Sequence, residues 1–163
     1  MGQDPQHAAP VASIPADSTE SVILKIRKEY ARINSDSAKY RVVHIEVLGE
    51  SSEGGDILRY FDGKHLIKAV ATSFGAGGNQ ITEYYYRDGK LFFCYDRLTM
   101  YNGPMESYTH SKIAEDRYYL DNLKLIRWVK PNGKIADKKL YPEKQKELAK
   151  EVIYVRTRKS DLP

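Results

Sequence analysis

Cysteine, tryptophan and long hydrophobic runs are scarce in this sequence. Cys94 is the one cysteine among 163 residues, which excludes an intramolecular disulfide framework and a cluster of thiolate metal ligands. No apolar run approaches the roughly 20 residues that a membrane-spanning helix requires. Because 41% of the residues are hydrophobic and 29% are charged, the composition predicts one folded domain and not a disordered chain.

Motifs for phosphate, metal and cofactor binding are also missing. The glycine-rich segment 74–79 (FGAGGN) lacks the Lys-Ser/Thr pair of a phosphate loop. We expect it to form an interstrand loop, with a lid over one end of a sheet as the alternative. The four histidines show neither HExxH nor His-x-x-x-His spacing. The sequence therefore indicates no metal ion and no cofactor.

Few groups are suited to acid–base or nucleophilic chemistry. Cys94 lies inside an apolar segment, which predicts an inert buried thiol. Glu83, Glu115 and Asp116 are candidates for paired carboxylates, but charged residues beside turns and at sheet edges are far more common than catalytic pairs. We therefore expect no catalytic residues, and the alternative is a small enzyme.

The net charge of +4 is unevenly distributed. Residues 124–163 hold 12 basic and five acidic residues, whereas residues 1–123 carry a small acidic excess. A basic end can contact an anionic surface, but glutamates alternate with lysines in 143–151, as on an ordinary solvated helix. No nucleic-acid-binding motif occurs, so we do not expect a nucleic-acid partner.

The start of the chain differs in composition from the rest. Residues 1–16 are rich in alanine, proline and small polar residues, which predicts a flexible leader before a single domain at 17–163. The sequence shows no basic segment followed by the apolar segment of a signal peptide. The short stretch Gln3-Asp4-Pro5 near the start, followed by a domain with one thiol, suits an exported bacterial protein. We expect the periplasm or cell envelope, with the cytoplasm as the alternative.

Helices are expected near both ends of the domain. In 18–33, apolar residues recur at near-helical spacing, and Asp17 with Glu20 resembles a capping box. A second helix is expected from Pro142 to about Val152 or Tyr154. The β-branched residues near its end leave open a final edge strand over 148–156.

Strands are expected between the helices. Residues 40–48 alternate as a half-buried strand does, and 57–70, 82–95 and 115–129 each combine aromatic residues with an Asp-Gly or Asp-Asn pair. Asp-Gly between alternating hydrophobics favours a hairpin, and a further turn is expected at 131–133. The prediction is an α+β domain, in which an N-terminal helix packs on a curved antiparallel meander of six to eight strands, followed by a short C-terminal helix.

The chain has 13 tyrosines, and eight of them fall between 84 and 119. With Asp88 and Gly89 in the turn of the second hairpin, a regular register separates two faces. The expected core face carries Tyr84, Tyr86, Leu91, Phe93 and Tyr95. The other face mixes Tyr85, Phe92 and Cys94 with charged residues, and it is covered by a helix, forms ordinary surface, or lines a groove.

The third hairpin adds further candidates for binding. With Asp121-Asn122 in the turn, Arg117 and Tyr119 share a face with Trp128, whereas a bulged turn shifted by one residue moves Trp128 to the other face. A tryptophan beside an arginine can stack on a planar or sugar ligand, although packing is the commoner role of large aromatics. The candidate contacts are Tyr85, Phe92, Arg117, Tyr119 and Trp128.

The hairpin unit at Tyr85–Phe92 and the segment 115–129 resemble uncharacterised exported proteins of Gram-negative bacteria. That resemblance implies a small antiparallel-sheet fold and carries over no functional residues. We expect a non-catalytic, exported binding or envelope-accessory protein that uses an aromatic sheet face for a protein, glycan or small apolar ligand. The alternative is a small enzyme of cystatin-like architecture, in which helix and curved sheet enclose an acid–base pocket with a close histidine–carboxylate pair.

Overall fold

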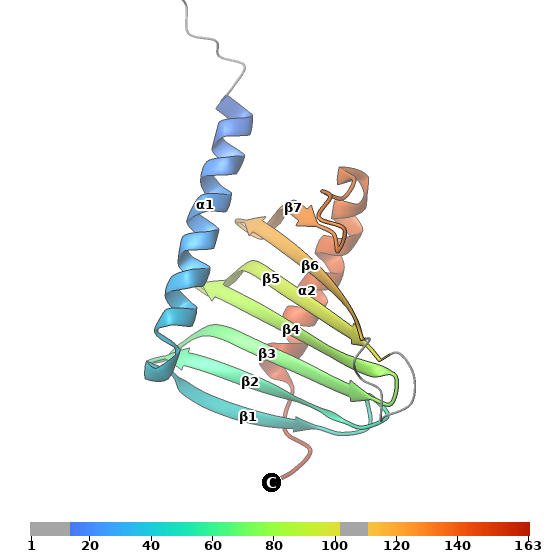
Figure 1. Cartoon of the computed structure of the whole chain (residues 1–163). Helices are drawn as coiled ribbons and strands as arrows, with labels where there is room; N and C mark the ends of the chain where they lie inside the picture. The colour runs from blue at the N-terminus through green and yellow to red at the C-terminus, as the bar shows by residue number, and fades with distance from the viewer. Residues whose placement is uncertain (1–13, 102–110) are drawn as a thin grey trace, which may run out of the picture.

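The computed structural model describes residues 14–101 and 111–163 of the chain. Its elements, drawn in Figure 1, are α1 (Ile14–Ser35), the 3₁₀ helix η2 (Ser37–Lys39), β1 (Arg41–Val47), β2 (Gly55–Asp62), β3 (His65–Gly75), β4 (Gly78–Arg87), β5 (Lys90–Met100), β6 (Lys112–Asp121), β7 (Lys124–Val129), the 3₁₀ helix η4 (Lys138–Leu140) and α2 (Tyr141–Thr157). Within the described ranges, seven strands form one sheet in which each strand pairs antiparallel with the next. The predicted α+β meander with two helices is therefore confirmed.

The two helices lie on opposite faces of the sheet (Figure 1). On the face under α1, called the α1 side, the buried residues are Ile23, Ile26, Ile33, Tyr40, Tyr85, Phe92, Phe93 and Tyr119. On the face under α2, called the α2 side, they are Ile45, Val47, Ile57, Ala69, Tyr84, Tyr86, Leu91, Cys94, Tyr118, Leu120, Leu125, Ala136, Tyr141, Leu148 and Val155. Because both faces are covered, successive tyrosines of β4 are buried although they point in opposite directions.

The N-terminal helix is longer than predicted. It begins at Ile14, so Asp17 lies inside the helix and the predicted capping box is wrong. Pro15 is tolerated because the N–H groups of the first helical turn have no partner within the helix. Residues 14–16, predicted as part of the leader, are helical. The rest of that leader, 1–13, lies outside the described residues.

The C-terminal helix is also longer than predicted, and the alternative of an edge strand over 148–156 is wrong. Leu148 and Val155, two helical turns apart, are both buried against the sheet. This burial outweighs the preference of the neighbouring β-branched residues for a strand. No helix within 14–101 or 111–163 has an apolar stretch long enough to cross a lipid bilayer.

The three predicted hairpins are present. Their two-residue turns are Gly63-Lys64, Asp88-Gly89 and Asn122-Leu123. Asp88 and Gly89 have φ angles of 52° and 75°, as a type I′ turn requires. The first and third turns each lie one residue later than the predicted Asp62-Gly63 and Asp121-Asn122 pairs, and Leu123 adopts a φ of 68° that a leucine rarely shows.

Each of these hairpins carries a β-bulge in its second strand. The pairing passes over Ile67 in β3, Phe92 in β5 and Ile126 in β7, so that none of the three has a residue directly opposite. All three side chains join the hydrophobic cluster on the α1 side. A bulge of this kind adds one side chain to a face and reverses the alternation beyond it.

The bulge at Phe92 corrects the predicted register of the second hairpin. Tyr86 pairs with Leu91 as predicted, but Tyr85 pairs with Phe93 and Tyr84 with Cys94. Phe93 and Tyr95 therefore lie on the α1 side, and Cys94 lies on the α2 side. Simple alternation is therefore wrong for Phe93, Cys94 and Tyr95, which follow the bulge, whereas Tyr84, Tyr85 and Phe92 lie on the faces predicted for them.

The third hairpin follows the bulged alternative. Trp128 pairs with Tyr118 on the α2 side, whereas Arg117 and Tyr119 pair with Val129 and Arg127. Trp128 therefore does not share a face with Arg117. The register with Asp121-Asn122 in the turn is wrong, and the shift that moves Trp128 to the other face is confirmed.

The two remaining predicted turns are also present. The segment 74–79 connects β3 to β4 through a tight turn and forms no lid. A Cβ atom at Gly78 would lie 2.0 Å from the carbonyl oxygen of Thr99, which explains a glycine at that position. At 131–133, the Gly133 N–H donates a hydrogen bond of 2.8 Å to the carbonyl of Lys130.

Candidate functional site

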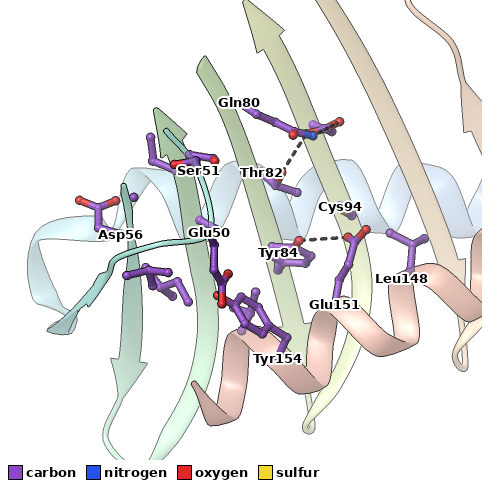
Figure 2. A pocket seen from close by; sticks show the side chains of 18 of the residues that line it. Glu50, Ser51, Asp56, Gln80, Thr82, Tyr84, Cys94, Leu148, Glu151 and Tyr154 are labelled. Atoms are coloured by element: carbon purple, nitrogen blue, oxygen red, sulfur yellow. Dashed lines mark hydrogen bonds between the residues drawn. The ribbon is translucent and has the colours of Figure 1, made fainter. Parts of the chain in front are cut away.

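A cavity of about 340 Å³ lies between α2 and the α2 side of the sheet (Figure 2). Strands β4 and β5 form much of its floor, α2 forms one wall, and the loop between β1 and β2 forms part of its rim. Its lining includes Glu50, Thr82, Tyr84, Cys94, Asp96, Tyr118, Lys144, Leu148, Glu151 and Tyr154.

Regular periodicity brings these side chains together. Thr82 and Tyr84 alternate along β4, and Cys94 and Asp96 do so along β5, so both pairs face α2. Positions 144, 148 and 151 of α2 lie four and three residues apart, which places them on one face of the helix. The cavity is thus a direct product of strand and helix geometry.

Glu151 is the central carboxylate of the cavity. It accepts a hydrogen bond of 3.1 Å from the hydroxyl of Tyr84, across the gap between α2 and β4 (Figure 2). Surrounding protein atoms raise the pKa of Glu151 above its ordinary value, while the Tyr84 hydrogen bond and the charge of Lys144 oppose that rise. The side chain still faces the open cavity, so this carboxyl group is accessible.

Asp96 is held by neutral donors on the floor of the cavity. Its carboxylate accepts hydrogen bonds of 2.9 Å from Gln80 and 2.8 Å from the hydroxyl of Thr82. In the register of β5 and β6, Asp96 lies directly opposite Asp116, and neighbouring like charges repel each other. The indole N–H of Trp128 donates a hydrogen bond of 2.7 Å to Asp116 and offsets part of that repulsion.

Lys144 is the cationic residue among those that line the cavity. Its ammonium group forms an ion pair of 2.7 Å with Glu147 on α2. The same group lies 5.7 Å from the ring centroid of Tyr118 and 5.2 Å from that of Trp128. Lys144 therefore caps an aromatic pair at one end of the cavity.

Cys94 is buried, as predicted, and its side chain lies at the floor of the cavity. Burial raises the pKa of the Cys94 thiol well above its ordinary value, and the carboxylates of Glu151 and Asp96 act in the same direction. A thiol in this environment stays protonated near neutral pH, so it is a poor nucleophile.

The rim of the cavity is tied to the end of α2. The hydroxyl of Tyr154 donates a hydrogen bond to Glu50, and Arg158 lies 3.6 Å from the same carboxylate. Asp161 accepts a hydrogen bond of 2.7 Å from the backbone N–H of Leu48. These contacts fix the loop between β1 and β2 against the C-terminal part of the chain.

Three of the predicted contact residues are buried under α1. Tyr85, Phe92 and Tyr119 have exposed fractions of 0%, 5% and 4%. The hydroxyl of Tyr85 is hydrogen-bonded to Glu83 at 3.0 Å and to Asn34 of α1. The mixed face is thus covered by a helix, one of the three alternatives, and Tyr85 and Phe92 do not form a groove on the surface of this structure.

The other two predicted contacts lie on opposite faces. Arg117 is half-buried on the α1 side, where it lines a second cavity together with Tyr119. Trp128 is half-buried on the α2 side and packs against Tyr118, with ring centroids 5.4 Å apart. The structure therefore brings Arg117 and Tyr119 together and separates both from Trp128.

His44, which does not line the cavity, contacts two carboxylates: that of Glu46 at 3.4 Å and that of Asp56, which does line the cavity. His44 Nε2 is 3.2 Å from Asp56, and both side chains are partly open to solvent. Figure 2 shows the Asp56 side chain pointing away from the groups around Glu151. Within the described ranges, no group of three or more His, Cys, Asp or Glu side chains is arranged to hold a metal ion.

Sequence reasoning missed Asp96 and Glu151. Glu151 was interpreted as one charge on a solvated helix, and nothing in the sequence indicates that α2 crosses the sheet at this point. Asp96 carried a weak signal, because alternation places it on the same face as Cys94.

Comparison with known proteins gave no relative. No protein-family model matches the chain, no curated protein matches it, and no solved structure matches its fold.

Proposed function

We propose that this chain is a binding protein whose ligand occupies the cavity between the sheet and α2. The observation that carries the proposal is an open cavity of about 340 Å³ lined by Tyr84, Asp96 and Glu151. This volume lies within the range of small-molecule sites. The proposal moves the ligand from the aromatic face predicted from sequence to the opposite side of the sheet.

The chemistry of the lining favours a ligand rich in hydroxyl groups. The carboxylates of Asp96 and Glu151 accept hydrogen bonds, and Lys144 donates them. Thr82 and Tyr84 can do both, and the tyrosine rings add apolar surface. Alternating donors, acceptors and rings suit a sugar of one or two units, which is the glycan class among the partners considered from sequence.

Export to the periplasm or cell envelope remains part of the proposal. Its test is the genomic sequence that encodes the precursor. An apolar signal segment upstream of Gln3 in that precursor supports export, and the absence of such a segment contradicts it.

The alternative of a small enzyme has one supporting observation. Glu151 faces the cavity with a raised pKa, which suits a group that accepts and returns a proton. Support for a second proton-transfer group beside Glu151 is weaker, since no histidine is among the residues that line the cavity within the described ranges.

The experiment is a nuclear magnetic resonance titration of the ¹⁵N-labelled protein with a panel of monosaccharides and disaccharides. We expect shifts at the amides of Thr82, Tyr84 and Glu151 for at least one sugar, and loss of those shifts in Asp96→Asn. Glu143→Gln, an exposed glutamate on α2 outside the cavity, is the matched control and should bind as the wild type does.

Three outcomes are informative. No shift at the cavity with any sugar of the panel contradicts the proposal, as does equal binding by Asp96→Asn and wild type. New sugar resonances that grow with time and vanish in Glu151→Gln favour the enzyme over the binding protein.

A further inference from the structure

A second cavity, of about 330 Å³, lies between α1 and strands β5 and β6. Tyr30 and Arg27 of α1 form one wall, and Phe93, Tyr95, Arg117 and Tyr119 of the sheet form the other. It is on the opposite side of the sheet from the cavity around Glu151. The two cavities are therefore separate sites.

The body of this second cavity is aromatic. Phe93 lies 5.3 Å from Tyr30 and 5.0 Å from Tyr119, measured between ring centroids. Tyr30 is only half-buried and Tyr95 is partly exposed, so part of this ring cluster is open to the cavity. Ring edges and faces of this kind bind flat or chain-like apolar groups.

Guanidinium groups flank the rings. Arg27 lies over Tyr119 with 5.9 Å from its Cζ to the ring centroid, and Arg117 lies over Tyr95 at 5.2 Å. Arg97 lies opposite Glu115 in the register of β5 and β6, and its positive charge helps to lower the pKa of the Glu115 carboxyl group. The strands thus add positive charge beside the cavity.

One carboxylate offsets this charge in part. Glu115 accepts hydrogen bonds of 3.0 Å from Arg117 and 2.7 Å from the hydroxyl of Tyr95. Among residues 14–101 and 111–163, Arg27 forms no ion pair with any carboxylate. Together with the hydrogen bond from Tyr95, Arg97 and Arg117 lower the pKa of Glu115, whereas Arg27 acts on Glu20, which is itself paired with Arg127. The described residues that line the cavity include the guanidinium groups of Arg27 and Arg117 and no carboxylate, so the charge of the lining is positive.

The phenol groups remain neutral donors under ordinary conditions. Burial and the nearby Glu115 raise the pKa of Tyr95 to about 12. Burial, together with the charge of Glu83, also raises the pKa of Tyr30. Neither phenol contributes a negative charge near pH 7, so nothing in these two rings repels an anion.

We propose that this second cavity binds an amphipathic carboxylate, with its apolar body against Phe93 and the tyrosine rings and its carboxylate held by Arg27 and Arg117. Guanidinium groups bind carboxylates through paired, charge-assisted hydrogen bonds, and the rings exclude water from the apolar part. A cavity of this size holds a short fatty acid or an aromatic acid. The site is independent of the sugar proposal.

The test is isothermal titration calorimetry with two anions, octanoate and indole-3-acetate, and their neutral amides, octanamide and indole-3-acetamide. We expect at least one anion to bind and its amide to bind about tenfold more weakly or not at all. Binding of octanoate alone identifies a fatty-acid site, and binding of indole-3-acetate alone identifies an aromatic-acid site.

Variants locate the binding. Arg27→Gln should weaken binding of the anion about tenfold, and since Arg27 is an exposed residue of α1, this variant should fold as the wild type does. Arg41→Gln is the matched control, because Arg41 also lies over a ring, that of Phe61, at a distant site. Its affinity should equal that of the wild type.

The proposal is overturned if neither anion binds, if each amide binds as tightly as its acid, or if Arg27→Gln binds as the wild type does. Amide shifts at Phe93 and Tyr119 in a parallel magnetic resonance titration distinguish this cavity from the one around Glu151. Shifts at Tyr84 alone would assign the anion to the other cavity and likewise overturn the proposal.

Discussion

Arg59 of β2 donates a hydrogen bond of 2.8 Å from its Nε to the carbonyl oxygen of Val155, in the last turn of α2. A second bond, of 2.6 Å, runs from the same guanidinium to the carbonyl of Arg158. Carbonyl groups at the end of a helix lack partners within the helix and carry a partial negative charge. Arg59 thus anchors the C-terminal end of α2 to the sheet.

We predict that Arg59→Met lowers the free energy of unfolding by about 2 kcal/mol, because two hydrogen bonds from a charged donor are lost at partly buried carbonyls. Chemical denaturation with urea measures this change. Arg41→Met, which removes an arginine that forms no such bonds among the described residues, should cost less than about 1 kcal/mol. Equal losses in both variants would contradict the anchoring role.

A second prediction concerns the pH dependence of stability. Burial raises the pKa of Glu151 in the folded protein. Between the unfolded and folded pKa values, the folded state therefore keeps a proton that the unfolded state has released, and stability falls as the pH rises. Glu151→Gln should lack this fall, so its stability relative to the wild type should increase from about pH 4 upward.

Denaturation curves of both proteins at several pH values provide the measurement. A difference between Glu151→Gln and wild type that stays constant with pH would show that burial does not disfavour the charged carboxylate.

A third prediction isolates the hydrogen bond between Tyr84 and Glu151. This bond opposes the rise in the pKa of Glu151, so Tyr84→Phe should move that pKa further up. Titration of the ¹³C-labelled side-chain carboxyl group by magnetic resonance measures the change. Tyr86→Phe is the control, since Tyr86 has no hydrogen bond to Glu151 in the described structure, and it should leave the titration unchanged.

A fourth prediction concerns Cys94. With an exposed fraction of 0% and a raised thiol pKa, Cys94 should react with a disulfide reagent only as fast as the protein opens. A cysteine introduced as Gly77→Cys, where a Cβ atom meets no other atom within 4 Å, should react at once in a Cys94→Ala background. Rapid labelling of Cys94 in the folded wild type would show that the cavity opens to its floor.

The fifth prediction uses two glycines at the same end of the sheet. A Cβ atom at Gly55 would lie 2.3 Å from the carbonyl oxygen of Thr72, whereas one at Gly77 would meet nothing. Gly55→Ala should therefore lower the midpoint of thermal unfolding by several degrees, and Gly77→Ala should not. Similar melting curves for both variants would contradict the close approach of β2 and β3 at this point.

Local signals in the sequence were sufficient for most of the fold. The Asp88-Gly89 turn and the alternation of β1 depend on neighbouring residues, and both were predicted correctly. The helix ends were less accurate: the sequence places Ser13 directly before Ile14 and Pro15 in the first turn, residue types that favour a helix start, but the prediction placed the cap at Asp17. The end of α2 depends on burial of Val155 against a distant strand, which local propensity does not encode.

The candidate site was harder to predict, for two physical reasons. A single bulged residue, Phe92, reverses the faces of everything after it in β5, and bulges have no strong sequence signature. Which face of the sheet each helix covers depends on tertiary packing. Because helices cover both faces, Tyr85 is part of the core instead of a surface groove, and Asp96 lines a cavity.

The position of α2 after all seven strands has a consequence for synthesis of the chain. A ribosome releases the whole sheet before Tyr141–Thr157 has emerged, so Ile57, Tyr84 and Leu125 stay uncovered on one face of the nascent domain. This interval exposes apolar strand surface to other chains and to chaperones. Translation that stops before α2 should therefore yield an aggregation-prone sheet, because α2 is the element that covers this face.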